Sequence, residues 1–248
     1  MKELRAELRK SRRRHNSLVS IAISVFVLLW STQTGGSGPE RLAQGYSCLF
    51  YGVPVMNTVI MPLGTAVLAS RIWDMENREN NCRLLFTLQS RDTLFFCKVI
   101  LGMAQILLVC LVEGVGLLVM GKLSGFTEVL DWTQFWWLMA CTFVVNAMLF
   151  FLWLWLSIRF PSQVPTLACG MVGSLSGLFS GFMPLWVSRF IPWGYYIPLS
   201  AMTMEWNSVT KEAHYIPTSY PLWLLAVTAA LLAVLALAAR QTLNRKEI

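Results

Sequence analysis

The chain contains six long apolar runs, and polar segments separate one run from the next. An α-helix rises 1.5 Å per residue, so about 20 apolar residues cross the hydrocarbon core of a bilayer. The pattern therefore predicts an all-α polytopic membrane protein with six transmembrane helices in a single domain over residues 1–248. The approximate ranges of the six spans are 17–30, 46–72, 96–120, 135–158, 164–187 and 220–239.

Composition supports the membrane assignment. The chain is 56% hydrophobic and 13% charged, whereas a soluble domain carries about 25% charged residues. The six cysteines form no CxxC pair and the two histidines lie far apart, so we expect neither a disulfide framework nor a metal site. The net charge is +7, but no nucleic-acid motif accompanies it, and we expect no nucleic-acid partner.

The distribution of basic residues predicts the orientation. The chain has 20 Lys and Arg residues, and an inside amino terminus leaves only four of them outside: Arg41, Lys122, Arg189 and Lys211. Cytoplasmic segments of membrane proteins are enriched in Lys and Arg. We therefore predict that both termini are cytoplasmic, with a cytoplasmic tail over residues 240–248.

The first 16 residues are strongly basic, and two leucines, Leu4 and Leu8, lie one helical turn apart. This pattern predicts an elbow helix that lies along the inner membrane surface. A solvated run of charge that only sets the topology is the alternative.

The longest predicted cytoplasmic insertion lies between the second and third spans. It begins with charged residues and continues as RLLFTLQSR, in which Leu84, Leu85 and Leu88 recur at helical spacing. We expect a short amphipathic helix whose apolar face is buried against a cytoplasmic partner, because soluble segments rarely leave such a face uncovered.

The basic amino terminus, the six runs and the segment RLLFTLQSRDTLFFCK together resemble the permeases of type-2 ABC exporters. More narrowly, ENNCRLLFTLQSR and IPWGYYIPLSAM are similar to the lantibiotic-immunity permeases of the MutE/EpiE and MutG types. The resemblance implies a bacterial cell-membrane protein whose helix after the second span couples to an ATPase subunit. The coupling residues it implies here are Glu76, Glu79, Arg83, Leu84, Leu85 and Leu88.

The chain lacks a GxxxxGK[ST] motif, so it has no phosphate-binding loop of its own and is not predicted to be an enzyme. The resemblance implies that a separate ATPase, acting as a dimer, binds ATP and Mg, and that a second permease subunit completes the exporter. It implies a lantibiotic-like peptide as cargo, with no cofactor in this chain. Export of drugs or other lipophilic molecules is one alternative, and a non-transporting membrane assembly or sensor protein is another.

Glu113 is the one acidic residue deep within a predicted span. A carboxyl group in a membrane is costly and usually faces protein or water. It either faces a cationic substrate or stays protonated in a helix contact, and no catalytic group accompanies it. Gln105 and Asn146 are its candidate hydrogen-bond partners, and Glu113 and Asn146 are the two residues within the spans that we assign to the candidate substrate path.

Three glycines, Gly173, Gly177 and Gly181, recur every four residues in the fifth span. Small residues at this spacing let two helices approach closely. The contact is either packing within the subunit or an interface between two permease subunits. In the second span, Pro54 and Pro62 predict a kink.

The segment between the fifth and sixth spans is rich in aromatic residues. Its first half, FIPWGYYIPL, is too short and too rich in proline to span a bilayer, so we expect a re-entrant or interfacial element on the outer face. The segment either caps the bundle or contacts an amphiphilic peptide, and the residues assigned to that contact are Trp193, Tyr195, Tyr196 and Glu205.

Overall fold

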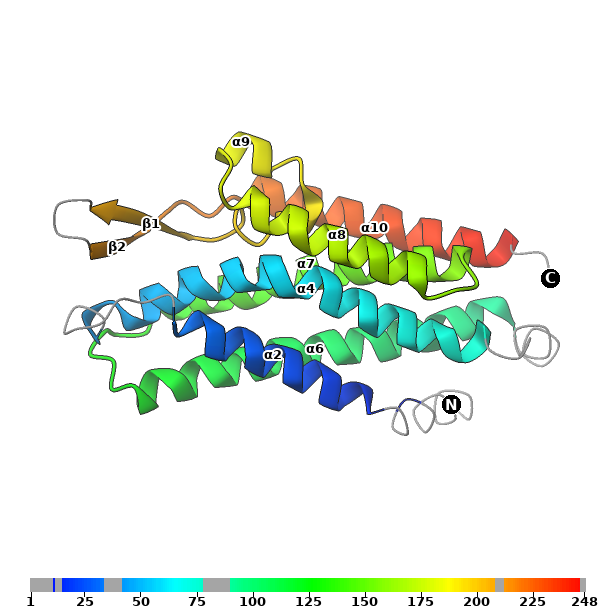
Figure 1. Ribbon diagram of the computed structural model, residues 1–248, viewed down its shortest axis with the longest axis horizontal. Helices are drawn as coiled ribbons and strands as arrows, with labels where there is room; N and C mark the ends of the chain where they lie inside the picture. The colour runs from blue at the N-terminus through cyan, green and yellow to red at the C-terminus, as the bar shows by residue number, and fades with distance from the viewer. Residues whose placement is uncertain (1–10, 12–14, 34–41, 78–89, 208–211, 246–248) are drawn as a thin grey trace.

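The computed structural model describes residues 11, 15–33, 42–77, 90–207 and 212–245, and it shows a bundle of long helices with a small β-hairpin at one end (Figure 1). The elements, in chain order, are α2 (Asn16–Ser31), α4 (Gly45–Asn77), α6 (Arg91–Leu123), α7 (Trp132–Arg159), α8 (Val164–Ser180), α9 (Leu185–Ser188), η2 (Pro192–Gly194), β1 (Met202–Asn207), β2 (Glu212–Pro217) and α10 (Leu222–Arg245).

One helix of the bundle overlaps each predicted apolar run, but the boundaries of the helices and the runs differ. Four helices, α4, α6, α7 and α10, are long and apolar enough to cross a membrane. The other two are shorter: α2 has 16 residues and α8 has 17, about 24 and 26 Å at 1.5 Å per residue. The structure thus establishes a mostly helical membrane protein with four clear candidate spans.

Several helix ends differ from the predicted ends of the runs; α4 continues to Asn77 beyond residue 72, and α6 already begins at Arg91 ahead of residue 96. The fifth span was expected to reach residue 187, but α8 ends at Ser180 because Gly181 and Pro184 follow, and proline cannot continue a helix. The last span was expected to end at residue 239, but α10 continues to Arg245. Its final turns are held against α6 by an ion pair between Arg240 Nε and Asp92 Oδ1, 2.8 Å apart.

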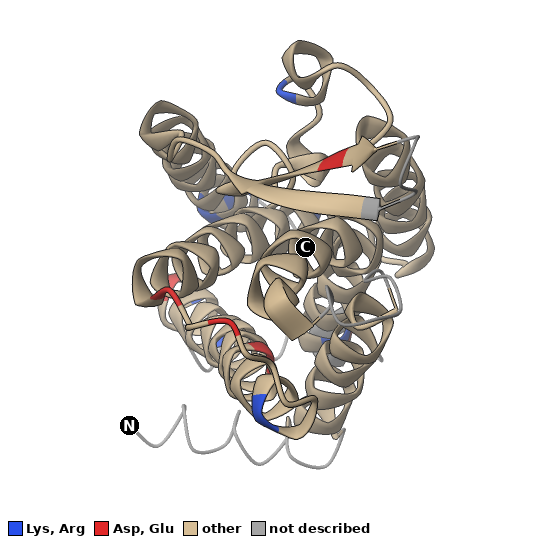
Figure 2. Cartoon of the chain, turned by 90° about the vertical axis from the view of Figure 1, so that its left-hand side faces the viewer, with Lys and Arg blue, Asp and Glu red and all other residues tan. Residues whose placement is uncertain are grey.

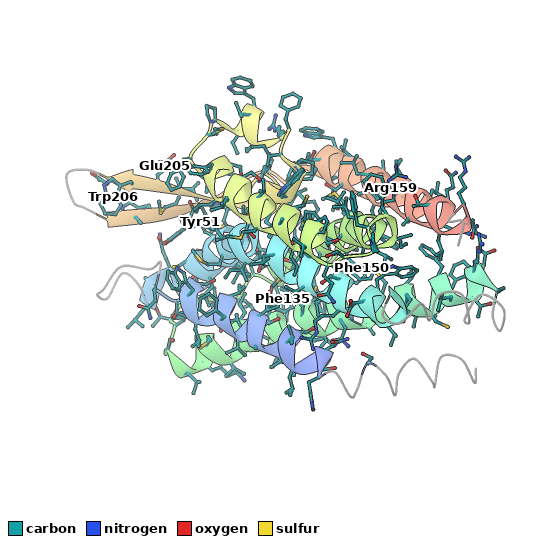
Figure 3. The ribbon with its side chains drawn as sticks, turned by 45° about the vertical axis from the view of Figure 1, so that its right-hand side comes forward. Tyr51, Phe135, Phe150, Arg159, Glu205 and Trp206 are labelled. Atoms are coloured by element: carbon teal, nitrogen blue, oxygen red, sulfur yellow. The ribbon has the colours of Figure 1, made fainter. Side chains whose placement is uncertain are left out.

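Helix α4 lies at the centre of the bundle and contacts α2, α6, α7, α8 and both strands. Helix α10 packs mainly on α7, and α2 packs on α4 and α6. Large side chains fill the interior; Trp153, which is 1% exposed, donates from Nε1 to Thr65 Oγ1 at 3.1 Å. Figure 3 shows Phe150 in this interior.

The bundle has two chemically different ends. We call the end that carries the strands the hairpin end and the opposite end, where α2 begins and α10 finishes, the tail end (Figure 1). Among the described residues, the helix segments at the tail end hold six basic residues, Arg71, Arg91, Lys98, Arg159, Arg240 and Arg245, and three acidic ones, Asp74, Glu76 and Asp92. The hairpin end holds two described basic residues, Lys122 and Arg189, and four acidic ones, Glu128, Asp131, Glu205 and Glu212 (Figure 2).

The hairpin departs from the all-α expectation. Strands β1 and β2 pair antiparallel, with Met202 opposite Pro217 and Asn207 opposite Glu212. The sheet has two strands, and it extends beyond the ends of the helices (Figure 1). A backbone hydrogen bond from Tyr215 N to Gln44 Oε1, 3.2 Å long, ties β2 to the start of α4.

Most residues of the predicted elbow helix, and the predicted coupling helix after Asn77, lie outside the described residues. The described helices nevertheless fix where the second of these segments is attached. Helix α4 ends at Asn77 and α6 begins at Arg91, both at the tail end (Figure 1). The segment that joins them therefore leaves and re-enters the bundle at its basic end.

Candidate functional site

Four buried polar side chains meet in the interior of the bundle, each from a different element. Asn57 on α4 donates from Nδ2 to Glu113 Oε2 on α6 at 3.1 Å. The hydroxyl of Tyr196 donates to Asn146 Oδ1 on α7 at 2.7 Å. Tyr196 also lies near Glu113, so the two hydrogen-bonded pairs are neighbours. We call these residues the polar cluster; all four are at most 3% exposed.

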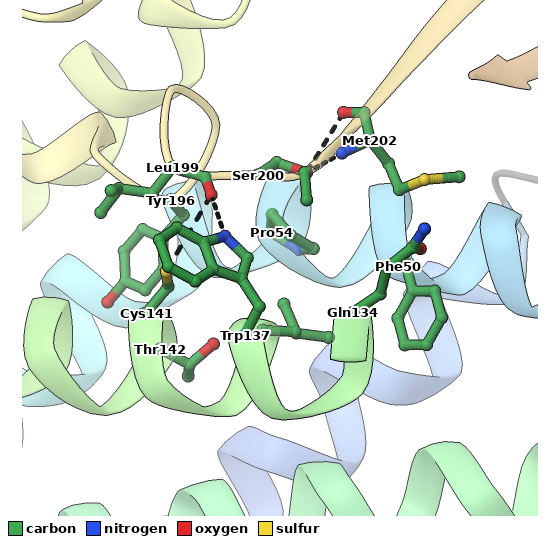
Figure 4. A pocket seen from close by; sticks show the side chains of 12 residues that line it. Phe50, Pro54, Gln134, Trp137, Cys141, Thr142, Tyr196, Leu199, Ser200 and Met202 are labelled. Carbon is green, nitrogen blue, oxygen red and sulfur yellow. Dashed lines mark hydrogen bonds between the residues drawn. The ribbon is translucent and has the colours of Figure 1, made fainter. Parts of the chain in front are cut away.

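Tyr196 enters the cluster from residues 191–201, which we call the cap segment. This segment contains η2 and folds back into the bundle, so that Tyr195, Tyr196 and Leu199 are buried. Figure 4 shows how it is fixed to α7: Trp137 Nε1 donates to the carbonyl oxygen of Leu199 at 2.8 Å. A cavity of about 10 Å³ beside Tyr196 has room for about one water molecule.

The polar cluster retains unused hydrogen-bonding capacity. Asn57 Oδ1, Glu113 Oε1 and Asn146 Nδ2 are buried and have no hydrogen-bond partner. Buried polar groups are normally paired, so unsatisfied atoms within one cluster indicate a place where a water molecule or a polar group of a ligand binds. The cluster offers Asn57 Oδ1 as an acceptor and Asn146 Nδ2 as a donor, and Glu113 Oε1 is a donor when the carboxyl group is protonated and an acceptor when it is not.

No basic side chain among the described residues pairs with Glu113. An isolated carboxylate is very costly in an apolar interior, so a buried carboxyl group without a cation is stable as the neutral acid. A neutral Glu113 accepts the Asn57 hydrogen bond through one oxygen and carries its proton on the other. The arrangement therefore acts as a neutral hydrogen-bonding site rather than as a fixed negative charge.

The structure brings together three of the six residues that were assigned to the substrate path: Glu113, Asn146 and Tyr196. Tyr195 and Trp193 belong to the same cap segment, but Trp193 packs against Gly173 on α8. Glu205 lies apart from them on β1, where it is exposed, and Figure 3 shows it with Trp206 on the projecting hairpin.

Asn57 was not identified as a partner of Glu113 from the sequence. Gln105, which was a candidate, instead accepts from Ser20 Oγ on α2 at 3.0 Å. The available signal was the polar amide of Asn57 in an apolar run, three residues after Pro54. That part of the run was interpreted only as the site of a kink. A buried amide opposite a buried acid is the pattern that would have found it.

Two of the three glycines, Gly173 and Gly177, lie in α8 and pack against other elements of the chain, whereas Gly181 follows α8 and is exposed. An added Cβ on Gly177 would lie 2.5 Å from the carbonyl oxygen of Thr58 on α4, and Gly173 lies against Trp193. Pro62 has no N–H to donate to the Thr58 carbonyl four residues earlier, which leaves that oxygen facing α8. The opposite face of α8 is exposed and apolar, and it carries Met171, Val172, Leu175 and Phe179.

Replacing Gly177 by alanine is expected to destabilise the protein by about 1–3 kcal/mol, because the new methyl group forces two helix backbones apart. Gly181→Ala is the matched control, since its Cβ would lie 3.1 Å from the tip of Ile197 and 3.4 Å from the Leu178 carbonyl oxygen, which leaves more room than at Gly177. Thermal unfolding in detergent compares the two variants. Equal melting temperatures would show that the close contact of α8 with α4 does not stabilise the fold.

The residues assigned to ATPase coupling are not tested by the geometry. Glu76 lies in the last turn of α4, and Glu79, Arg83, Leu84, Leu85 and Leu88 lie outside the described residues. The polar cluster is nevertheless connected to this segment through the chain, because Asn57 and Glu113 lie on the two helices that flank it. About 20 residues separate each of them from the tail end, or about 30 Å of helix.

The chain matches the family model described as ABC-2 family transporter protein over residues 3–177. This match covers well over half of the chain and includes the helices from α2 to most of α8. No curated protein matches the chain. The apolar helices, the charge difference between the two ends and the extent of the match agree with one another. The chain therefore belongs to the ABC-2 transporter family, as a multi-pass membrane permease that works with an ABC ATPase.

Proposed function

We propose that the chain is the permease subunit of a bacterial ATP-driven exporter that expels lantibiotic or similar antimicrobial peptides from the cell membrane. Residues 1–248 form one permease domain with six spans, an amino-terminal elbow and a coupling helix between the second and third spans. The exporter contains a second permease subunit and two ATPase chains, which bind ATP and Mg.

The observation that carries the proposal is the basic tail end, from which the segment after Asn77 emerges. Basic residues mark the cytoplasmic side of membrane proteins, so the tail end with both termini faces the cytoplasm. The segment between α4 and α6 is then exposed to a cytoplasmic ATPase. This is the position that a coupling helix requires.

The two short helices also fit a six-span topology. At about 24 and 26 Å they fall a few ångströms short of a hydrocarbon core of about 30 Å. Local thinning of the bilayer accommodates such a mismatch at a modest cost. Both helices contact α4, and they run alongside the clear candidate spans in the bundle (Figure 1).

The peptide cargo is supported by the cap segment. IPWGYYIPLSAM, which resembles the immunity permeases, is the stretch that places Tyr196 in the polar cluster. The hairpin beside it exposes Glu205 and Trp206, an acid and an aromatic ring that suit a cationic amphiphilic peptide. Export of drugs or lipophilic molecules is the second candidate, and the uncharged character of the polar cluster favours it.

The deciding experiment expresses the chain with its neighbouring ATPase and measures two properties: ATPase activity of the purified complex and survival of cells exposed to lantibiotics. The control is the same complex with the phosphate-binding lysine of the ATPase replaced. We expect ATPase-dependent protection against peptides. Protection against lipophilic drugs but not against peptides would overturn the peptide cargo, and a stable complex without any ATPase would overturn the exporter.

A further inference from the structure

A groove opens at the hairpin end, separate from the polar cluster. Its volume is about 600 Å³, and it is bounded by the first part of α4, the end of α8, α9, the base of the hairpin and the first turn of α10. The elements that form its walls come from both sides of the cap segment in sequence. The groove is therefore part of the fold and does not depend on a single loop.

Among the residues that the structure describes, Arg189 is the one charged residue that lines this groove. Its guanidinium lies over the ring of Trp223, with 5.1 Å between Cζ and the ring centroid. Arg189 has no ion pair with any described acid. Three described acids of the hairpin end, Glu128, Asp131 and Glu205, do not line the groove. An oriented cation without a counter-ion therefore faces an otherwise uncharged groove.

The remaining lining combines hydroxyl groups with apolar side chains. Thr203, Ser219 and Tyr220 contribute hydroxyls, while Met183, Leu185 and Trp223 contribute apolar surface. Around the groove, Phe182, Phe190 and Leu222 are each at least 67% exposed. This apolar rim continues onto the exposed faces of α8 and α10, so the groove opens toward the surface that faces lipid.

We infer that this groove binds a phospholipid, with the phosphate of the headgroup on Arg189 and the acyl chains along the exposed faces of α8 and α10. Arginine recognises phosphate oxygens through paired N–H donors, and nearby hydroxyls add further donors. The positive charge disfavours a cationic peptide at this position. The inference rests on the chain spanning a membrane and is independent of the cargo.

The test measures the lipids that stay bound to the purified permease complex by native mass spectrometry. Phosphatidylglycerol is added in detergent, and diacylglycerol with the same acyl chains serves as the ligand without phosphate. We expect phosphatidylglycerol to bind and Arg189→Gln to weaken it about fivefold, as expected for loss of one basic contact to an anionic lipid. Lys122→Gln is the matched control, because it removes a positive charge at the same end but outside the groove.

Three results would overturn the inference. The first is equal phosphatidylglycerol binding by Arg189→Gln and Lys122→Gln, and the second is diacylglycerol binding as tight as that of phosphatidylglycerol. The third is displacement of the bound lipid by millimolar glycerol phosphate, which would identify a free anion as the ligand. Trp223→Leu gives a second variant that weakens binding by releasing the guanidinium while retaining apolar bulk. Because peptide protection is not measured, failure of the proposed cargo leaves this result intact.

Discussion

Replacing both Leu84 and Leu85 by aspartate is expected to release the permease from its ATPase and to abolish ATP-driven transport. In the proposed function, these leucines form the apolar face that docks into the ATPase. An uncompensated charge buried in an interface costs about 3–5 kcal/mol. Association should therefore weaken at least about a hundredfold. Co-purification would measure the loss of the complex, and an ATPase assay would measure the loss of coupling.

The matched control places the same two charges at the opposite end of the bundle. Leu123 and Val129 are 79% and 89% exposed at the hairpin end, so Leu123→Asp with Val129→Asp should leave the complex intact. If the Leu84 and Leu85 variant still co-purifies with an ATPase that responds to the permease, the docking segment lies elsewhere in the chain. Loss of the complex in both double variants would instead indicate a general defect in membrane insertion.

The positions of the helices were largely predictable because hydrophobicity alone determines which segments lie in lipid. The runs at residues 96–120 and 135–158 fall within α6 and α7. The hairpin carried a local signal that was missed. Along β1, the sequence MTMEWN alternates apolar and polar residues, which is the pattern of a strand, but the segment was expected only to cap the bundle or to contact a peptide.

Contacts between helices were harder to predict than the helices themselves. Helix α4 is apolar on nearly all sides, so its sequence carries no periodic signal that tells which side faces α6. Asn57 and Glu113 are 56 residues apart, and their meeting depends on the rotation of both helices. The glycines of α8 were predictable as a close contact, but their partner on α4 depends on the carbonyl that Pro62 leaves free.

The same contacts suggest how a signal from the ATPase reaches the interior of the membrane. The segment at the tail end joins α4 to α6, and Asn57 and Glu113 join these two helices again about 30 Å away. A displacement of the segment moves both helices together, and the cap segment meets them through Tyr196. In the proposed function, the polar cluster is the point where motion from the cytoplasmic side reaches the hairpin end.

The polar cluster predicts a clear difference between two replacements of Glu113. Glutamine has nearly the same shape and keeps an acceptor for Asn57, so Glu113→Gln should retain stability within about 1 kcal/mol and retain transport. Leucine leaves the Asn57 amide unpaired in the interior, which costs about 1–3 kcal/mol. Thermal unfolding and peptide protection, measured on the same preparations, separate the two variants.

A double-mutant cycle with Asn57→Leu isolates the hydrogen bond. The double variant combines Asn57→Leu with Glu113→Leu. If the two side chains act as partners, its loss of stability should be smaller than the summed losses of the two single variants by at least about 0.5 kcal/mol. Because a carboxyl group that stays protonated and a glutamine amide are both uncharged, the native protein and Glu113→Gln should also show the same transport between pH 6 and pH 7. Loss of transport in Glu113→Gln with unchanged stability would instead show that the exporter needs the negative charge or the proton of Glu113, and it would assign the polar cluster to a cationic substrate.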